Sequence, residues 1–160
     1  MSKVAVVYWS GTGNTAAMAS AVEAGARDRG AEVSVFGPDE FTPDKVSEFD
    51  AIAFGCPAMG AEVLEESSYD PMFTAVEGSL SGKKIALFGS YGWGDGQWMR
   101  DWEDRCNVAG AQLACESVMA NNTPEEDSLQ ECRDLGAALA PWADPFRNES
   151  LRTLGLTKEK

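Results

Sequence analysis

The chain has 160 residues, 44% of them hydrophobic, which is enough for one domain with an ordinary core. It contains no histidine, so the usual general base near neutral pH and every Ser-His-Asp or Cys-His nucleophile arrangement are excluded. Its net charge of −13, from 26 acidic and 13 basic side chains, disfavours binding to nucleic acid or to an anionic membrane.

Predicted strands and helices alternate along the chain. Short apolar runs typical of buried strands occupy residues 3–8, 32–36, 50–55, 84–90 and 111–119. Helical patterns fall between and after them, at residues 15–29, 43–48, 71–77, 97–109 and 123–139. This alternation predicts an α/β fold, a doubly wound, five-stranded parallel sheet with helices on both faces. We expect one domain over residues 1–140, with residues 141–160 as an extension that is either packed on the domain or flexible.

Nothing in the sequence predicts export, a membrane span or a metal site. No apolar stretch approaches the roughly 20 residues that a membrane span needs, and the N-terminal apolar run is too short for a signal peptide. The four cysteines form no CxxC pair and show no zinc-type spacing, so we expect them to be small buried side chains in a reducing compartment. The prediction is a cytoplasmic protein.

A loop rich in glycine and hydroxyl groups, WSGTGNTAAM at residues 9–18, follows the first predicted strand. It lacks the third glycine of the dinucleotide fingerprint and the Gly-Lys-Ser/Thr of a triphosphate loop. Neutral hydroxyl, amide and backbone N–H donors at a helix N-terminus can bind a phosphate monoester without a basic side chain. The alternative is a turn that only caps the following helix. The predicted phosphate-binding residues are Ser10, Gly11, Thr12, Gly13, Asn14 and Thr15.

Two further unusual loops follow the third and fourth predicted strands. The first, GCPAMGAEVLEESS, places Met59 beside Gly60, and the second, GSYGWGDGQWM, interleaves glycines with Tyr91, Trp93 and Trp98. A tryptophan on a glycine-rich loop is poorly explained by folding alone, whereas stacking on a planar ligand explains both the ring and the glycines. Because the carboxyl ends of parallel strands meet at one edge of a sheet, we expect the three loops to converge.

These three motifs, SGTGNT, GCPAMG-x-E-x-L-E and GSYGWGDGxWM, resemble those of the flavodoxins, in particular the short-chain clostridial type, over about residues 3–140. The resemblance implies the strand order 2-1-3-4-5 and bound FMN, with the isoalloxazine ring between Met59 and Trp93. It also implies that Gly60 lets its peptide turn so that the carbonyl accepts a hydrogen bond from the reduced ring. The implied FMN-binding residues are Ser10, Gly11, Thr12, Gly13, Asn14, Thr15, Pro57, Ala58, Met59, Gly60, Ala61, Glu62, Ser90, Tyr91, Gly92, Trp93, Gly94 and Asn122.

Two positions depart from some members of that family. Pro57 stands where some have a hydroxyl group, and Ala61 replaces an acid. These differences concern the affinity for FMN and its potential, and not the choice of cofactor.

The implied function is that of a low-potential one-electron carrier, working between the semiquinone and hydroquinone of bound FMN and shuttling electrons between redox enzymes. No catalytic residue is predicted, and we expect a monomer. One alternative is an FMN-dependent NAD(P)H oxidoreductase that reduces quinone or flavin, which the short chain and the shielding Trp93 disfavour. Another is a receiver-type signalling module, which needs an acidic pair that the first strand's end, VVYWSG, lacks.

Acidic residues gather in and after the two loops that carry Met59 and Trp93, called here the ring loops. They predict a docking surface for basic redox partners, with an ordinary solvated face as the alternative. The residues are Glu62, Glu65, Glu66, Asp70, Asp95, Asp101 and Asp104.

Overall fold

The computed structural model describes residues 2–140, and the predicted extension at residues 141–160 lies outside the described residues. Its strands are β1 (Lys3–Tyr8), β2 (Glu32–Phe36), β3 (Ala51–Gly55), β4 (Lys84–Tyr91), β5 (Gln112–Leu113) and β6 (Val118–Asn121). Its helices are α1 (Asn14–Asp28), the 3-10 turn η1 (Pro38–Glu40), α2 (Pro43–Val46), α3 (Tyr69–Glu77), α4 (Gln97–Val108) and α5 (Glu126–Leu139). The predicted alternation of strands and helices is confirmed.

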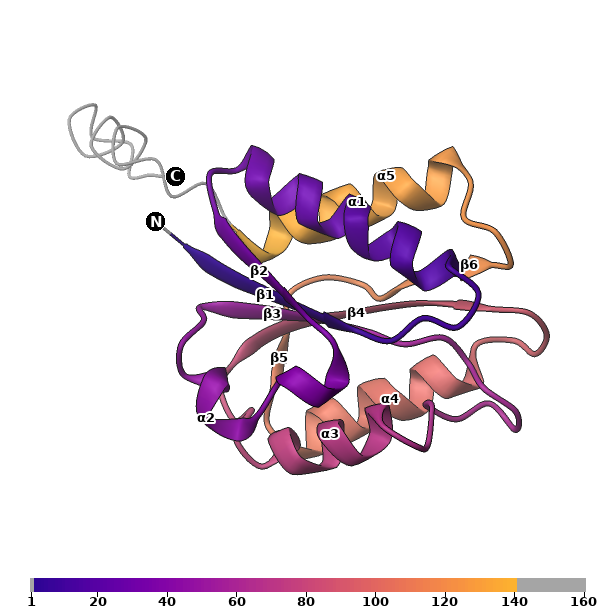
Figure 1. Ribbon diagram of the computed structural model, residues 1–160, viewed down its shortest axis with the longest axis horizontal. Helices are drawn as coiled ribbons and strands as arrows, with labels where there is room; N and C mark the ends of the chain where they lie inside the picture. The colour runs from indigo at the N-terminus through magenta and orange to yellow at the C-terminus, as the bar shows by residue number, and fades with distance from the viewer. Residues whose placement is uncertain (1, 141–160) are drawn as a thin grey trace.

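The strands form a parallel sheet in the order β2-β1-β3-β4-β5, as the resemblance implied (Figure 1). In the middle of this sheet, Val4 pairs with Val33 of β2 on one side and with Ala51 of β3 on the other. The chain first adds a strand on one side of β1 and then crosses to the other side, so the strand order reverses between β1 and β3. Ligands of such sheets bind outside the carboxyl ends of the strands at this reversal.

The fifth position of the sheet is filled by two short strands and not by one strand over residues 111–119. Both β5 and β6 pair with β4, Leu113 opposite Ile85 and Val118 opposite Phe88. Between these two pairs the edge strand has two more residues than β4, so residues 114–117 form a bulge, in which Ala114 still donates its backbone N–H to the carbonyl of Ile85 at 2.8 Å. The hydroxyl of Ser117 donates a hydrogen bond to Glu103 of α4 at 2.6 Å, which anchors the bulge outside the sheet.

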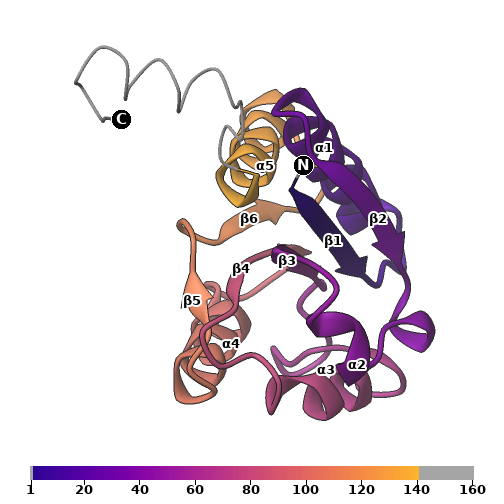
Figure 2. The same ribbon diagram turned by 90° about the vertical axis from the view of Figure 1, so that its left-hand side faces the viewer.

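Helices cover both faces of the sheet, giving three layers (Figures 1 and 2). Helices α1 and α5 lie on one face, and α2, α3 and α4 lie on the other. Side chains of a strand alternate between the faces, so Val4 and Val6 of β1 pack in the core under α1 and α5, whereas Ala5 and Val7 pack in the other core. All four side chains are fully buried, which fixes the strand that carries the first loop.

Helices α1 and α5 approach each other very closely. A Cβ atom on Gly25 of α1 would lie 1.9 Å from the carbonyl oxygen of Arg133, and one on Gly136 of α5 would lie 2.0 Å from that of Val22. Only glycine fits at these two contacts, so the pair fixes how the two helices pack over the sheet. None of the helices within residues 2–140 combines the length and apolar character required to span a membrane.

Candidate functional site

The loop between β1 and α1 folds around the N-terminus of α1. The hydroxyl oxygen of Ser10 accepts hydrogen bonds from the backbone N–H groups of Gly13 at 3.1 Å and Ala16 at 3.2 Å. Among the described residues, no group accepts a hydrogen bond from the backbone N–H of Gly11, Thr12 or Thr15. These N–H groups stand where the helix dipole favours an anion.

A buried pair of hydroxyl groups joins this first loop to the third. The Thr15 and Ser90 side chains are hydrogen-bonded at 3.0 Å, and the backbone N–H of Ser90 donates to the Thr15 hydroxyl at 3.4 Å. Thr15 is 1% exposed and Ser90 is 5% exposed. The position of the first loop relative to β4 is therefore fixed within the protein itself.

The second loop continues the pairing of β3 with β4 and then closes into a tight turn. Ala58 donates its backbone N–H to the carbonyl of Ser90 at 2.9 Å, which holds the second loop against the third. Met59 and Val63 exchange two backbone hydrogen bonds of 2.9 and 3.0 Å across the turn. Within it, Gly60 has φ +44° and Glu62 has φ +58°. A side chain at φ +58° is uncommon, so the Glu62 backbone needs support from its surroundings.

That support comes from α4. The Glu62 carboxylate accepts a hydrogen bond at 3.1 Å from the backbone N–H of Gln97, the first residue of α4. Gly94 lies directly beneath this carboxylate, since a Cβ atom there would meet the Glu62 side chain at 2.6 Å. The second and third loops therefore pack against each other at the rim of the site as well as at its base.

The third loop is fastened to the end of β6 and to the core. Asn122 donates its backbone N–H to the carbonyl of Tyr91 at 2.7 Å, and the Asn121 side-chain amide lies 3.3 Å from the same oxygen. Trp98 turns inward, where it is 1% exposed and its indole N–H donates to the carbonyl of Cys56 at 3.2 Å. The Trp93 side chain, in contrast, is 67% exposed.

A cleft of about 230 Å³ opens where the three loops meet. It contains ten of the residues predicted to bind FMN, contributed by all three loops and by the end of β6: Gly11, Thr12, Asn14, Pro57, Ala58, Met59, Ser90, Tyr91, Gly92 and Asn122. The other predicted residues lie in the same loops but outside this lining, namely Ser10, Gly13, Thr15, Gly60, Ala61, Glu62, Trp93 and Gly94. The role of each one in binding FMN stays a prediction.

Two residues of the site were not predicted. Trp9 lines the cleft, and its indole packs on Gly11, where a Cβ atom would lie 3.0 Å from the ring. The sequence carried a signal for Trp9, because this aromatic residue directly precedes the predicted phosphate-binding residues 10–15. Trp93 is placed similarly, within the glycine-rich ring loop. Asn121 supports the carbonyl groups of Tyr91 and Gly92, a role with no recognisable sequence signal.

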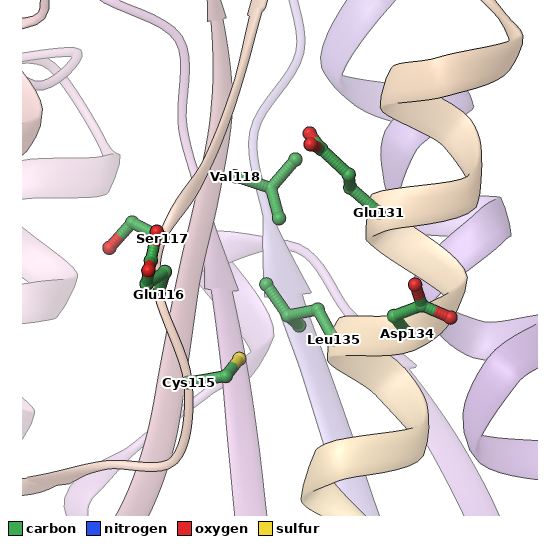
Figure 3. A pocket seen from close by; sticks show the side chains of 7 residues that line it. All are labelled: Cys115, Glu116, Ser117, Val118, Glu131, Asp134 and Leu135. Atoms are coloured by element: carbon green, nitrogen blue, oxygen red, sulfur yellow. The ribbon is translucent and has the colours of Figure 1, made fainter.

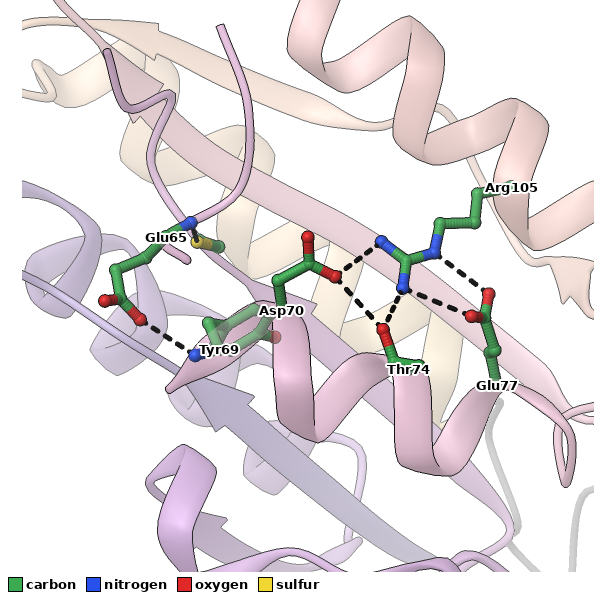
Figure 4. A network of polar contacts seen from close by, with 7 residues as sticks. Glu65, Tyr69, Asp70, Thr74, Glu77 and Arg105 are labelled. Atoms are coloured by element: carbon green, nitrogen blue, oxygen red, sulfur yellow. Dashed lines mark hydrogen bonds and ion pairs between the residues drawn. The ribbon is translucent and has the colours of Figure 1, made fainter. Parts of the chain in front are cut away.

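Glu65, predicted as part of an acidic surface, is instead 6% exposed and serves the fold. Its carboxylate accepts hydrogen bonds from the backbone N–H groups of Ser67, Ser68 and Tyr69 at 2.9, 2.9 and 2.8 Å, at the start of α3. Figure 4 shows the bond from Tyr69. The hydroxyls of Ser67 and Ser68 also donate to it. Burial alone would raise the pKa of Glu65, but these hydrogen bonds outweigh it and lower the pKa to about 2. Short polar side chains after a glutamate are the signal for this cap.

Asp70 is also engaged within the protein. Arg105 of α4 donates to Asp70 at 2.9 Å and, through its Nε, to Glu77 at 2.9 Å, while its guanidinium lies 4.9 Å from the centre of the Phe73 ring (Figure 4). This network connects α3 to α4 beneath the ring loops. Four of the predicted acidic residues remain exposed, namely Glu66, Asp95, Asp101 and Asp104.

The cleft fits the chemistry of FMN at its phosphate end. The unpaired N–H groups of the first loop lie at a helix N-terminus with neutral hydroxyls beside them, a donor set suited to a phosphate monoester. Tyr91, Met59 and Trp9 give the rest of the cleft an apolar and aromatic lining, as a planar ring requires.

Comparisons with known proteins agree with this geometry. A family model described as Flavodoxin matches residues 6–136. The chain is 46% identical to a flavodoxin of Megasphaera elsdenii over 137 residues, which cover 86% of this chain and 98% of that protein. It is 43% identical to a flavodoxin of Clostridium beijerinckii over 135 residues, covering 84% and 97% of the two chains.

Solved structures give the same result. The solution structure of two-electron reduced Megasphaera elsdenii flavodoxin matches with a TM-score of 0.79 at 46% identity, covering 86% of this chain and 98% of that one. A flavodoxin from the domain Archaea matches with a TM-score of 0.76 at 30% identity, covering 86% and 96%. These matches do not favour the alternative of an NAD(P)H-dependent reductase. The chain belongs to the flavodoxin family, in its short-chain clostridial type, and is an electron-transfer protein that uses bound FMN.

Proposed function

We propose that FMN lies in the cleft with its phosphate on residues 10–15 and its ring beside Met59, with Trp93 on the other face. The observation that carries this proposal is the set of unpaired N–H groups of Gly11, Thr12 and Thr15 at the N-terminus of α1. The hydrogen bond between Ala58 and Ser90 brings the Met59 turn to the same cleft. Trp93 is free to cover a ligand because no core contact occupies its exposed side chain.

FMN, when bound, supplies the one-electron chemistry. The residues of the protein then bind and orient it and limit the access of water. Phosphate binding needs only the neutral donors of the first loop, and among the described residues no lysine or arginine lines the cleft to offset the acidic charge of the chain. A surrounding negative charge disfavours the addition of an electron, which supports operation at low potential in the more reduced of the two one-electron couples.

We further propose that redox partners with basic surfaces dock on the acidic rim, defined as Glu62, Glu66, Asp95, Asp101 and Asp104. Four of these side chains are exposed, and Glu62 is held at the base of the rim by Gln97. Complementary charge speeds the encounter of two proteins more than it strengthens their complex. The protein acts as a monomer in the cytoplasm, in keeping with its free cysteine thiols.

Cofactor binding is tested by titrating the apoprotein with FMN and following the loss of flavin fluorescence. We expect one FMN per chain, much weaker binding of riboflavin, and a two-step reduction in a redox titration. Purified protein mixed with NAD(P)H and a quinone should show no steady turnover. Failure to bind FMN, or sustained turnover with NAD(P)H alone, would contradict the proposal.

Partner docking is tested separately by stopped-flow oxidation of the reduced protein by a basic haem protein. The variant Asp101→Lys should lower the second-order rate constant about threefold to tenfold at low salt, with the difference shrinking as salt is added. Glu32→Lys is the matched control. It changes the charge equally but lies at the start of β2, at the opposite edge of the sheet. Equal effects of the two variants would show that total charge, and not the rim, governs the rate.

A further inference from the structure

A second cavity lies on the α1 and α5 side of the sheet, between the bulge at residues 114–117 and helix α5. It has a volume of about 210 Å³ and is called here the Cys115 groove. Figure 3 shows residues of the bulge and β6 on one side and residues of α5 on the other. The lining residues are Cys115, Glu116, Ser117, Val118, Glu131, Asp134 and Leu135. The groove exists because the two extra residues of the bulge separate β5 from β6.

The groove has an apolar floor and an acidic rim. Val118 and Leu135 are buried and point into the space between the bulge and α5 (Figure 3). Glu116, Glu131 and Asp134 are exposed carboxylates around it, and no lysine or arginine lines it. A segment that offers apolar side chains together with cationic ones is complementary to such a surface.

Residues 141–160 of this chain have that composition. They carry the large apolar side chains Trp142, Phe146, Leu151, Leu154 and Leu156. They also carry more basic than acidic residues, in contrast to the chain as a whole, and the basic ones are Arg147, Arg152, Lys158 and Lys160. The match to the family model ends at residue 136, so this segment lies beyond the part that the family accounts for.

The part of the chain that the structure describes ends close to the groove. Helix α5 ends at Leu139, one turn after Leu135 on the groove floor. At a rise of about 1.5 Å per residue, the axis of α5 covers only about 6 Å between these two residues. Twenty residues can span many times that distance, so the segment can reach the groove of its own chain without strain.

We propose that the Cys115 groove is the docking site for the chain's own segment 141–160, which covers it with apolar side chains on Val118 and Leu135 and arginines on the acidic rim. This interaction is independent of FMN binding, since the groove shares no residue with the cleft of the three loops. It covers the groove and its acidic rim in a chain whose match to the family model ends at residue 136.

Cys115 provides a built-in reporter of this docking. It is partly exposed, whereas Cys56, Cys106 and Cys132 are buried. The rate at which iodoacetamide, a neutral reagent, alkylates Cys115 in the FMN-loaded full chain therefore measures how far the groove is covered. A Cys115→Ser variant identifies the reacting thiol by mass spectrometry, because it should abolish the signal.

The test compares the full chain with the double variant Arg147→Glu/Arg152→Glu. We expect alkylation to become at least fivefold faster, because repulsion from Glu131 and Asp134 releases the segment. Burial and the nearby Glu116 already raise the pKa of the Cys115 thiol, and added negative charge would raise it further and slow alkylation. A faster reaction would therefore show that the groove has been uncovered, because the electrostatic effect alone would make alkylation slower. Adding Glu131→Lys and Asp134→Lys to the double variant should restore protection to within about twofold.

Three results would overturn the proposal. The first is an unchanged alkylation rate in the double variant. The second is protection that depends on protein concentration, with a dimer in light scattering, which would mean that the segment of another copy docks. The third comes from hydrogen exchange on the unaltered chain. Among described residues, no group accepts a hydrogen bond from the backbone N–H groups of residues 115–117, so exchange there as fast as at residues 93–95 would show an uncovered groove whatever the variants do.

Discussion

Glu62 and Gln97 join the two ring loops through one hydrogen bond, in which the Gln97 backbone N–H donates to the Glu62 carboxylate at 3.1 Å. Gln97 opens α4, so the carboxylate lies at a helix N-terminus, where the helix dipole stabilises negative charge. The same side chain is predicted to face the cofactor. One carboxylate therefore connects the folding of α4 with the charge around the ring.

The variant Glu62→Gln separates these two roles when it is compared with Glu66→Gln, which removes a neighbouring exposed charge. Glu62→Gln should lower the free energy of unfolding by about 0.5 to 1 kcal/mol, because a charged acceptor at a helix N-terminus is lost. Glu66→Gln should change it little. Both should raise the lower one-electron midpoint potential by about 10 to 30 mV, from Coulomb's law in water at about 10 Å. Urea unfolding and spectroelectrochemical titration measure the two effects, and equal destabilisation by the two variants would contradict the capping role.

Gly60 offers a test of the turn beside the ring. Its φ of +44° lies where a residue with a side chain is strained, although a Cβ atom there would meet no neighbour within 4 Å. Gly60→Ala should therefore hinder the rotation of the following peptide and remove about 1 kcal/mol of hydrogen bonding to the reduced ring. The upper one-electron midpoint potential should fall by about 40 mV. Gly78→Ala, at φ −68° and also in open space, is the control and should leave the potential unchanged.

Glu65 predicts a specific pH dependence of stability. The fold lowers the pKa of its carboxyl from 4.5 to about 2, so its contribution is complete above pH 4.5 and is lost as the pH falls towards 2. Glu65→Gln should be less stable than the parent by about 2 kcal/mol at pH 7, because hydrogen bonds to a charged acceptor are weakened. Urea unfolding from pH 7 to pH 2 should show the two proteins converging. A constant gap across that range would show that Glu65 acts without its charge.

The contact between α1 and α5 predicts a large effect from one methyl group. Gly136→Ala would place a Cβ atom 2.0 Å from the carbonyl oxygen of Val22, so the helices must move apart. We expect a loss of about 1 to 3 kcal/mol, typical of overpacking, even though alanine favours a helix by up to about 1 kcal/mol over glycine. Thermal unfolding of the FMN-loaded protein measures it. An increase in stability would mean that the helices have room that the structure does not show.

The sequence predicted the framework of the fold because the signals are local. The apolar runs of β1 and β2 and the glycine after α1 predict their ends to within a residue or two. The two-residue bulge before β6 was missed, since it depends on pairing with a strand far away in the chain. Glu65 was misplaced for a related reason. A glutamate near exposed acids looks solvated until the backbone folds its N–H groups around it.

The same distinction between local signals and distant contacts applies to the candidate site. Its loops were recognisable from glycine spacing and from the resemblance to a family, both of which are written in short stretches of sequence. The contacts that join those loops, such as Ser90 with Ala58 and Asn121 with Tyr91, are separated by about 30 residues and leave no local pattern. Trp9 was visible in the sequence as the first residue of the loop at residues 9–18, but it was not predicted to line the site.

Thr15 belongs to the phosphate loop and Ser90 to the ring loop, and their buried hydroxyl groups share one hydrogen bond. A ligand that fixes the conformation of one loop must then also favour the ligand-binding conformation of the other. A fragment that carries only the phosphate and a fragment that carries only the ring should therefore bind cooperatively, each strengthening the other by the same factor.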